Sequence, residues 1–369
     1  MGSRLMAIVA EGDKGRVYLE PILMHDQIAR NARPSWYPDV ELPERALGFR
    51  VQEYGMTKWG DLFTPRQLVA LDTFSDLVQE AIPRIEKDAV QAALADDNVG
   101  LEAGGTGARA YAEAVGVYLA FAVDKVADRN STVCAWASLR EHARNTFGRQ
   151  AIPMVWDFAE SNPLSESSGN FDGGIVSIVA GLGSLIPIAS GHASQVDAQS
   201  QEVASAKVIS SDPPYYDNIG YADLSDFFYV WLRHSIKGVF ASLFSTLAVP
   251  KAEELVATPY RHGSKEKAEE FFLDGMTLAM HQLVELSHSG FPVTIYYAFK
   301  QSENNEIEGL TNTGWDTFLA AIFEAGFALT GTWPMRTELD RRMVGLGTNA
   351  LASSIVLVCR KRSPNAPIS

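Results

Sequence analysis

The last third of the chain alternates between helical and extended patterns, and this alternation constrains the fold more than any other feature. The expected helices span residues 266–288 and 315–325, and the expected strands span residues 291–299, 327–333 and 352–359. Strands that alternate with helices of about 10–20 residues are typical of a layered α/β fold. The continuous apolar run from Ile355 to Cys359 indicates the interior of a sheet. A polar loop before this strand predicts a terminal hairpin.

The earlier part of the chain predicts helices joined by irregular segments. Thr64 before Pro65 is an N-cap hydroxyl followed by a first-turn proline, so a helix should begin there and be kinked or interrupted at Pro83. Further expected elements are a strand at residues 15–19, an amphipathic helix at 108–128, a loop at 161–174, a strand at 207–211 and a helix at 223–233. We expect two parts, an irregular segment plus helix at residues 1–100 and a larger portion at 101–369.

Composition restricts the class of protein only mildly. The chain has 369 residues, 46% of them hydrophobic, so it can bury a substantial core. There is no charged leader and no apolar run of about 18 residues, which predicts a cytoplasmic protein outside the membrane. The two cysteines cannot form a zinc site by themselves, and His281 and His288 lack partners at metal-ligand spacing. The sequence therefore predicts no metal site.

The segment that carries chemistry directly follows the expected strand at residues 207–211, and it reads Asp212-Pro213-Pro214-Tyr215. The carboxylate of Asp212 and the carbonyl of Pro213 can each accept a hydrogen bond from an exocyclic amine, which turns the nitrogen lone pair toward an electrophilic methyl group. The prolines restrict the backbone and stiffen the carbonyl acceptor. Tyr215 offers a flat face to a planar base. A rigid turn that ends strand pairing is the structural alternative.

Neighbouring residues could complete a base pocket. Tyr216 or Tyr221 could form a second aromatic wall, with packing as the alternative for both. Asp217 and Asn218 could contact the edge of the base or cap the turn. In open α/β sheets, ligands bind beyond the carboxyl ends of the strands, where Asp212 is expected.

A net charge of −14 argues against a protein whose whole surface is basic and binds nucleic acid, because Lys and Arg supply the phosphate contacts. Local patches would have to supply the phosphate contacts. Two groups of arginines are candidates, and solvated helix faces or salt bridges are their alternative: Arg140, Arg144 and Arg149, and Arg336, Arg341 and Arg342.

The extended block from Asp212 to Leu232 resembles the catalytic motif of amino-methyltransferases that use S-adenosylmethionine. In this form it is similar to the large bacterial adenine-specific DNA methylases that also carry a zinc ribbon. Three other stretches agree, at residues 61–69, 147–160 and 347–358. The resemblance implies a Rossmann-like methyltransferase sheet with a terminal antiparallel hairpin, S-adenosylmethionine as cofactor, and DNA as partner. It also implies a role in restriction-modification or phage defence.

The sequence departs from the family at the cofactor site. Members have a glycine-rich cofactor loop near the N-terminus, followed by the zinc ribbon, and this sequence contains neither. It resembles the C-terminal part of such an enzyme, without the cofactor-loop strand, so a separate or missing N-terminal half is an expected partner. Phe63, Thr64 and Pro65 resemble the segment that lies against the methionine part of the cofactor, although a helix N-cap explains them too. The glycines at residues 104–107 could form a substitute loop or a simple turn.

Three functions remain open from the sequence. The first is methylation of the exocyclic amine of a flipped adenine in DNA. The second is methylation of a guanine amine in RNA, because some RNA methyltransferases carry the same four residues. The third is an inactive fragment or a non-catalytic nucleic-acid-binding subunit, which the missing glycine loop and the acidic charge favour.

Overall fold

A computed structural model shows a mixed α/β protein, and it describes residues 3–46, 48–202, 205–216, 219–297, 313–336 and 353–363. The chain forms two compact units. The first unit comprises Met1–Gly191 and Tyr221–Pro250, and the second unit comprises His192–Gly220 and Lys251–Ser369. Neither unit has a boundary at residue 100, because the helices on either side of this position pack together in the first unit.

The second unit is built on a four-stranded mixed sheet in the order β5-β6-β8-β7. Its strands are β5 (Ser210–Ser211), β6 (Val293–Tyr297), β7 (Phe327–Arg336) and β8 (Ser353–Lys361). β5 runs parallel to β6, whereas β8 is antiparallel to both β6 and β7. The expected terminal hairpin is therefore present, and β8 lies inside the sheet as its apolar run predicts.

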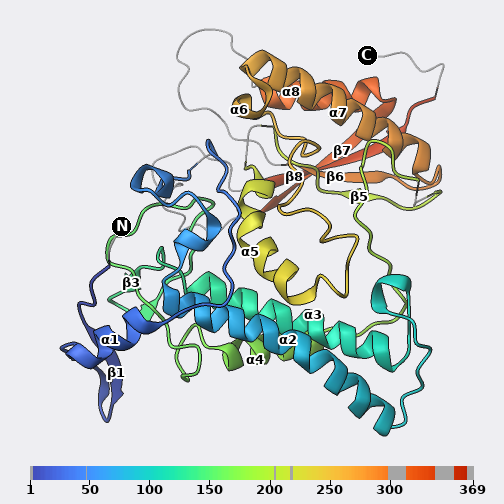
Figure 1. Ribbon diagram of the computed structural model, residues 1–369. Coiled ribbons are helices and arrows are strands. Elements are labelled where there is room, and N and C mark those ends of the chain that lie inside the picture. Colours follow the sequence, from blue (N-terminus) through green and yellow to red (C-terminus); the bar gives the residue numbers. More distant parts are fainter. Residues whose placement is uncertain are drawn as a thin grey trace. The chain divides into compact units, whose positions relative to one another are not determined.

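Two helices cover one face of this sheet (Figure 1): α7 (Lys265–Leu286) and α8 (Thr313–Glu324). Alternation along β6 explains the packing, since Val293, Ile295 and Tyr297 are buried while Thr294 and Tyr296 are half-buried. The buried set packs against Phe272 of α7 and Phe318 of α8. A short helix, α6 (Pro259–His262), precedes α7.

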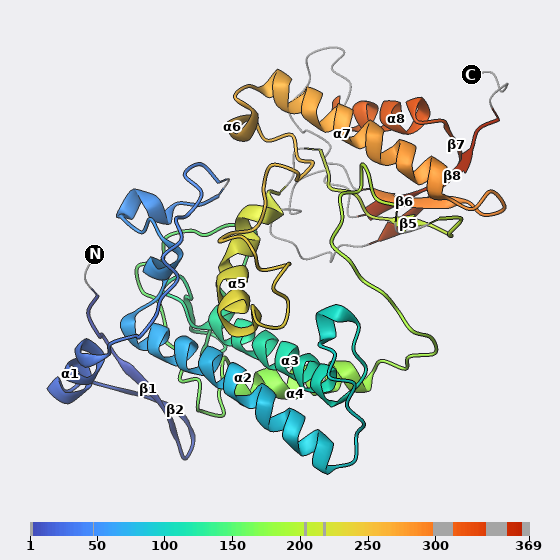
Figure 2. The ribbon, with the colours of Figure 1, turned by 45° about the vertical axis from the view of Figure 1, so that its right-hand side comes forward.

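The first unit is mainly helical. Its long helices are α2 (Pro65–Gln91), α3 (Ala108–Arg129), α4 (Phe171–Gly183) and α5 (Tyr221–Ile236). Figure 2 shows α2 and α3 lying side by side, with α4 against α3. Its smaller elements are β1 (Ile8–Gly12), β2 (Gly15–Leu19), α1 (Leu23–Asn31), β3 (Trp136–Ala137), β4 (His142–Ala143), and the 3-10 helices Val51–Tyr54, Trp59–Leu62 and Leu101–Ala103.

The start of α2 follows the predicted cap chemistry. The Thr64 hydroxyl accepts a hydrogen bond from the Gln67 amide, and the Gln67 side chain accepts one from the Thr64 amide at 2.8 Å. The prediction for Pro83 was wrong where it required an interruption, because α2 continues through this proline to Gln91.

Two other expectations differ from the structure. The strand expected at residues 207–211 is limited to β5, with an isolated bridge between Lys207 and Ser287 before it. The loop expected at 161–174 gives way to α4 at Phe171. In the part of the chain that the structure describes, no helix has both the length and the apolar character needed to cross a membrane.

Candidate functional site

The candidate site lies at the carboxyl ends of β5 and β6 in the second unit. β5 and β6 are parallel, with Ser211 opposite Ile295, so their carboxyl ends lie at the same edge of the sheet. Asp212 follows β5 directly, and Tyr297 is the last residue of β6. This is the edge at which open α/β sheets bind ligands.

Asp212 and Tyr215 are joined within the motif. The Tyr215 hydroxyl donates a hydrogen bond to Asp212 Oδ1 at 3.4 Å, a long contact that leaves the carboxylate free to accept others. Asp212 and Pro214 are exposed, whereas Pro213 and Tyr215 are half-buried. The Asp212 carboxylate is therefore accessible, and the tyrosine ring lies beside it.

Tyr297 packs against the Asp212–Tyr216 segment. Its ring meets that of Tyr215 edge-on at 5.4 Å and stacks on Phe318 of α8 at 4.0 Å. Its hydroxyl accepts a hydrogen bond from the Tyr216 amide at 3.4 Å. Tyr297 is 1% exposed, so this support is rigid. Tyr297 was not among the site residues predicted from the sequence, where it lies within the strand expected at residues 291–299.

Tyr216 is firmly anchored. Its hydroxyl donates to Glu269 Oε1 at 2.5 Å, and its carbonyl accepts from the Ala257 amide at 2.8 Å. Its ring meets Phe272 edge-on at 5.2 Å. A Cβ at Gly314 would come within 2.9 Å of the same ring, so the start of α8 needs a glycine there. These contacts make Tyr216 an anchor that fixes the position of Asp212 and Tyr215.

Three more residues were predicted to contact the substrate: Asp217, Asn218 and Tyr221. Asp217 and Asn218 lie outside the described residues. Tyr221 is the first residue of α5 in the first unit and is 55% exposed. Its carbonyl accepts a hydrogen bond from the Ser225 hydroxyl at 2.6 Å, which belongs to the first turn of that helix.

The predicted cofactor residues lie in the first unit. Phe63 is 6% exposed and packs on Phe227 at 5.6 Å and on Trp231 at 5.4 Å, both from α5. Thr64 caps α2, and its hydroxyl also donates to Glu160 Oε1 at 2.6 Å. Pro65 is exposed and has no amide hydrogen to donate.

Three of the stretches that carry the family resemblance converge in this unit. Phe147 meets Phe227 edge-on at 5.1 Å, and Phe63 stacks on the same ring. Arg66 Nε donates to Glu160 Oε2 at 3.0 Å, which ties the start of α2 to the end of the stretch 147–160. Residues far apart in the sequence therefore form one aromatic core, and the Arg66–Glu160 ion pair joins two of the stretches beside it.

The glycines at residues 104–107 form a turn whose amides are already bonded. Asp97 accepts hydrogen bonds from the Thr106 amide at 2.9 Å and the Val99 amide at 3.0 Å. These bonds, with that of Thr106 first, lower the pKa of Asp97. The arrangement matches the turn-and-cap alternative, because a carboxylate of the chain occupies the position that an anionic ligand would take.

One group of side chains in the first unit has metal-like spacing. His234 Nε2 lies 3.1 Å from Asp72 Oδ1 and 3.4 Å from Asp76 Oδ1. Asp72 also accepts from the Ser35 hydroxyl at 2.5 Å, and the His234 ring stacks on Trp36 at 4.0 Å. These bonds account for the arrangement as a network that joins α2, α5 and the segment at Trp36.

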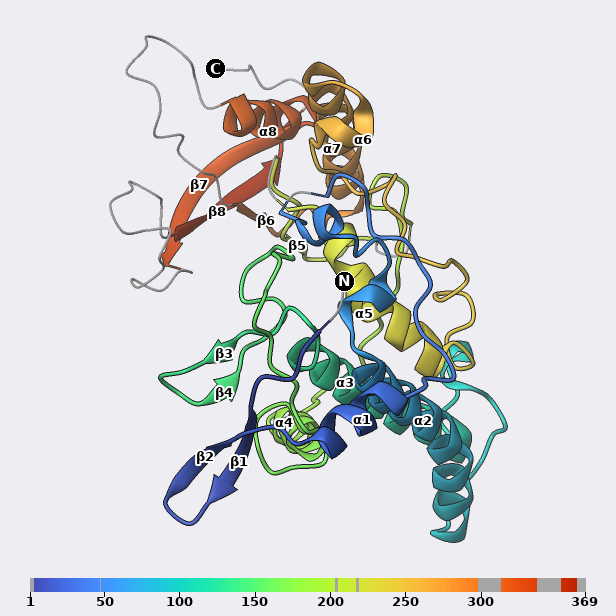
Figure 3. The ribbon, with the colours of Figure 1, turned by 60° about the vertical axis from the view of Figure 1, so that its left-hand side comes forward.

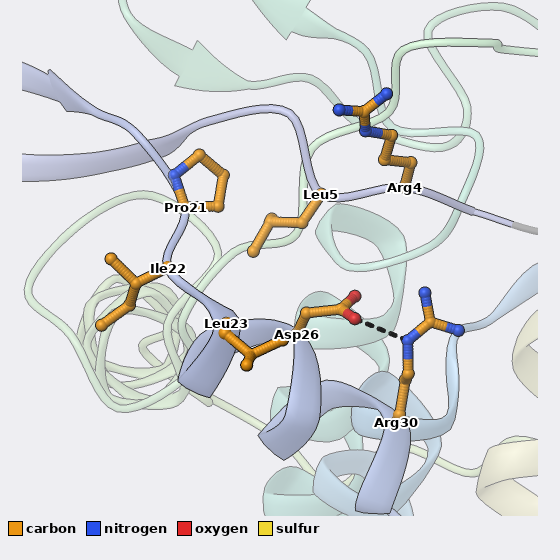
Figure 4. Close-up of a pocket in the computed structure, with 7 residues that line it drawn as sticks. All are labelled: Arg4, Leu5, Pro21, Ile22, Leu23, Asp26 and Arg30. Carbon is orange, nitrogen blue, oxygen red and sulfur yellow. Dashed lines mark hydrogen bonds and ion pairs between the residues drawn. The ribbon is translucent and has the colours of Figure 1, made fainter.

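The described structure has a cavity of about 300 Å³ in the N-terminal segment of the first unit. Figure 4 shows the Asp26–Arg30 ion pair of α1 on its floor, with the side chain of Leu5 above it. Its lining residues are Arg4, Leu5, Pro21, Ile22, Leu23, Asp26 and Arg30. None of them is a predicted site residue.

Comparison of the chain with protein-family models, with curated proteins and with solved structures gave no match.

Proposed function

We propose that the chain carries the acceptor half of an adenine-specific DNA methyltransferase that uses S-adenosylmethionine. The observation that supports this most is the exposed Asp212 carboxylate at the carboxyl end of β5, with the Tyr215 ring beside it and a rigid tyrosine beneath. The terminal antiparallel hairpin β7–β8 and the mixed α/β class agree with the sheet that the resemblance implies.

The proposed chemistry uses two acceptors and one aromatic face. Asp212 accepts one hydrogen of the exocyclic amine of adenine, and the Pro213 carbonyl accepts the other, so the nitrogen lone pair points away from the ring plane toward the methyl donor. Tyr215 stacks on the base. Stacking contributes about 1–3 kcal/mol and each hydrogen bond about 0.5–1.5 kcal/mol, which together offset the few kcal/mol that flipping a base costs.

The residues that were predicted to contact the methyl donor fit that role less well than Asp212 and Tyr215 fit the role of contacting the base. Thr64 uses its hydroxyl and its amide in the helix cap, Pro65 has no donor, and Phe63 is buried in the aromatic core. The amides of Gly104 and Gly105 donate to the carbonyls of Leu101 and Gly100, and those of Thr106 and Gly107 donate to Asp97. We therefore assign no step of the methyl transfer to these groups, and we propose that a separate or missing N-terminal half supplies the cofactor loop.

A transfer assay tests the proposal. Wild type, Asp212→Ala and Asp274→Ala, each joined to an N-terminal segment that carries the glycine-rich cofactor loop, are incubated with methyl-labelled S-adenosylmethionine and either unmethylated duplex DNA or unmodified RNA. Asp274 is an exposed carboxylate on α7 and serves as the matched control. We expect label in DNA from wild type and from the control, and a loss of about 100-fold or more in Asp212→Ala.

Each other outcome decides against the proposal in a different way. Equal labelling by wild type and Asp212→Ala would contradict the assigned site. Asp212-dependent label in RNA alone would favour the guanine amino-methyltransferase alternative. Absence of label from wild type joined to the cofactor-loop segment would contradict the proposed enzyme, and it would favour the non-catalytic subunit.

A further inference from the structure

A fully exposed leucine stands at the tip of the β3–β4 hairpin in the first unit. Leu139 has a relative exposure of 101% and is flanked by the exposed residues Ser138 and Arg140. Burial of a leucine side chain is worth about 1.5–3 kcal/mol, and Leu139 gains none of this when the protein folds. Single exposed apolar residues are common on protein surfaces, so exposure alone does not give Leu139 a function. The structure of the surrounding hairpin supplies the further evidence.

The hairpin holds this tip rigidly. Trp136 pairs with Ala143 and Ala137 with His142. The Ala137 carbonyl closes the turn, because it accepts from the Arg140 amide at 3.0 Å and from the Glu141 amide at 2.7 Å. Leu139 is therefore carried on a fixed turn.

A second hairpin braces the first (Figure 3). Tyr18 of β2 donates its hydroxyl to Glu141 Oε1 at 3.1 Å, and its ring meets Trp136 edge-on at 6.5 Å. The contact with Tyr18 holds the Glu141 carboxylate, the one acidic group of the turn sequence 138–141.

The root of the hairpin is anchored in buried structure. The Thr146 amide donates to the Asp128 carbonyl of α3 at 2.6 Å, and the Thr146 hydroxyl bonds to that of Ser131 at 2.8 Å. Thr146 is 3% exposed and Ser131 is fully buried. The root of the hairpin is therefore tied by hydrogen bonds to α3 and to the residue segment that follows it.

Positive charge accompanies the apolar tip. Arg140, Arg144 and Arg149 are all exposed, and within the described ranges none of them has an ion-pair partner. In a chain with a net charge of −14, the hairpin carries two of these arginines: Arg140 lies in the turn beside Leu139, and Arg144 donates its amide to the Ala135 carbonyl at the other end of the hairpin. Their charge makes the hairpin suited to a polyanion. Apolar wedges next to arginines are the means by which many proteins part stacked base pairs.

We propose that Leu139 is a wedge that inserts between base pairs of duplex DNA, with Arg140 and Arg144 bound to the flanking phosphates. This inference rests on the proposed function, which makes a DNA duplex the substrate. Insertion buries the leucine side chain and offsets part of the few kcal/mol that unstacking a base step costs.

Helical unwinding tests the wedge without any methyl donor and without knowledge of a target sequence. Closed circular plasmid is relaxed by a topoisomerase in the presence of saturating protein, and the linking number is measured after the protein is removed. Wild type should shift the linking number, and Leu139→Ala should reduce the shift by about twofold or more, whereas Leu139→Phe should retain it. Leu164→Ala is the matched control, because Leu164 is an 82% exposed leucine in another loop of the same unit.

The arginines are tested by the salt dependence of DNA binding. Arg140→Ala and Arg144→Ala should each weaken binding and lower the slope of log K against log salt by about 1. An equal linking-number shift in wild type and Leu139→Ala, binding by wild type without a shift, or no binding by wild type would each overturn the wedge. A Leu139-dependent shift without methyl transfer would instead contradict the proposed enzyme and leave the wedge standing.

Discussion

Tyr215 makes two separable contributions to the candidate site, one through its hydroxyl and one through its ring. The hydroxyl donates to Asp212 at 3.4 Å, a weak contact, whereas the ring packs against Tyr297 and borders the exposed carboxylate. The two contributions predict different results for two substitutions. The role of the ring as a stacking face is the more important of the two.

Tyr215→Phe should change kcat/KM for DNA little, because the ring remains. Tyr215→Ala should lower it by about 5–150-fold, which corresponds to the loss of about 1–3 kcal/mol of stacking. Tyr111→Ala serves as a control, since Tyr111 is 52% exposed on α3. Thermal unfolding of each variant separates a damaged site from a damaged fold. Equal losses in the phenylalanine and alanine variants would contradict the stacking role.

At the level of elements, the sequence predicted those helices and strands that carry strong local signals. The cap at Thr64 marked the start of α2, and the alternation after residue 265 marked α7, β6, α8 and β7. It missed α4, which contains four glycines, residues that disfavour helix by about 1 kcal/mol each. Asn170 was the available signal, because its side chain caps that helix by accepting from the Gly173 amide at 2.8 Å.

The candidate site was predicted only in part for a related reason. The chemistry of Asp212 and Tyr215 is local and can be read from their sequence. Their supports come from β6, α7 and α8, and nothing in the sequence marks Tyr297, Glu269 or Gly314 as partners of the motif. The amphipathic helix expected at residues 108–128 forms as α3, and its buried face is made of small residues such as Ala120, while Tyr111 and Tyr118 are exposed.

Asp124 of α3 makes the stability of this helix depend on pH. Its Oδ1 atom is buried without a hydrogen-bond partner among the described residues, and burial, followed by the charge of Asp128, raises the pKa of the carboxyl group. The folded protein keeps this proton at pH values where the unfolded chain loses it, above about 4. The group therefore contributes stability at low pH that is lost as the pH rises.

Asp124→Asn removes this dependence. Relative to wild type, its free energy of unfolding should increase between pH 4 and pH 8, as measured by urea denaturation. Asp88→Asn changes an exposed carboxylate on α2 and should show no such gain. Parallel pH profiles for wild type and Asp124→Asn would contradict the raised pKa.

On the scale of the whole molecule, the motif block is divided between the two units. Asp212 to Gly220 belongs to the second unit, and the helix that follows from Tyr221 belongs to the first. Each unit also contains one buried cysteine, Cys134 in the first and Cys359 in the second. The two thiols can therefore report on the two units separately.

Both thiols should be unreactive in the native protein. Burial raises the pKa of Cys134, and it raises the pKa of Cys359 from 9.0 to about 12. At pH 8, alkylation followed by mass spectrometry should show neither cysteine modified until urea unfolds its unit. Because unfolded Cys359 ionises first, the stability of the second unit should also fall as the pH rises from 9.0 toward 12. Rapid labelling of native protein at pH 8 would contradict the assigned burial.

The most direct test of the proposed function is the identity of the methylated nucleoside. DNA and RNA incubated with the protein joined to the cofactor-loop segment and with deuterated-methyl S-adenosylmethionine are digested to nucleosides and analysed by mass spectrometry. The account predicts deuterated N6-methyladenine from DNA with wild type and its loss with Asp212→Asn. Labelled N2-methylguanine from RNA, or N6-methyladenine formed equally by Asp212→Asn, would contradict it.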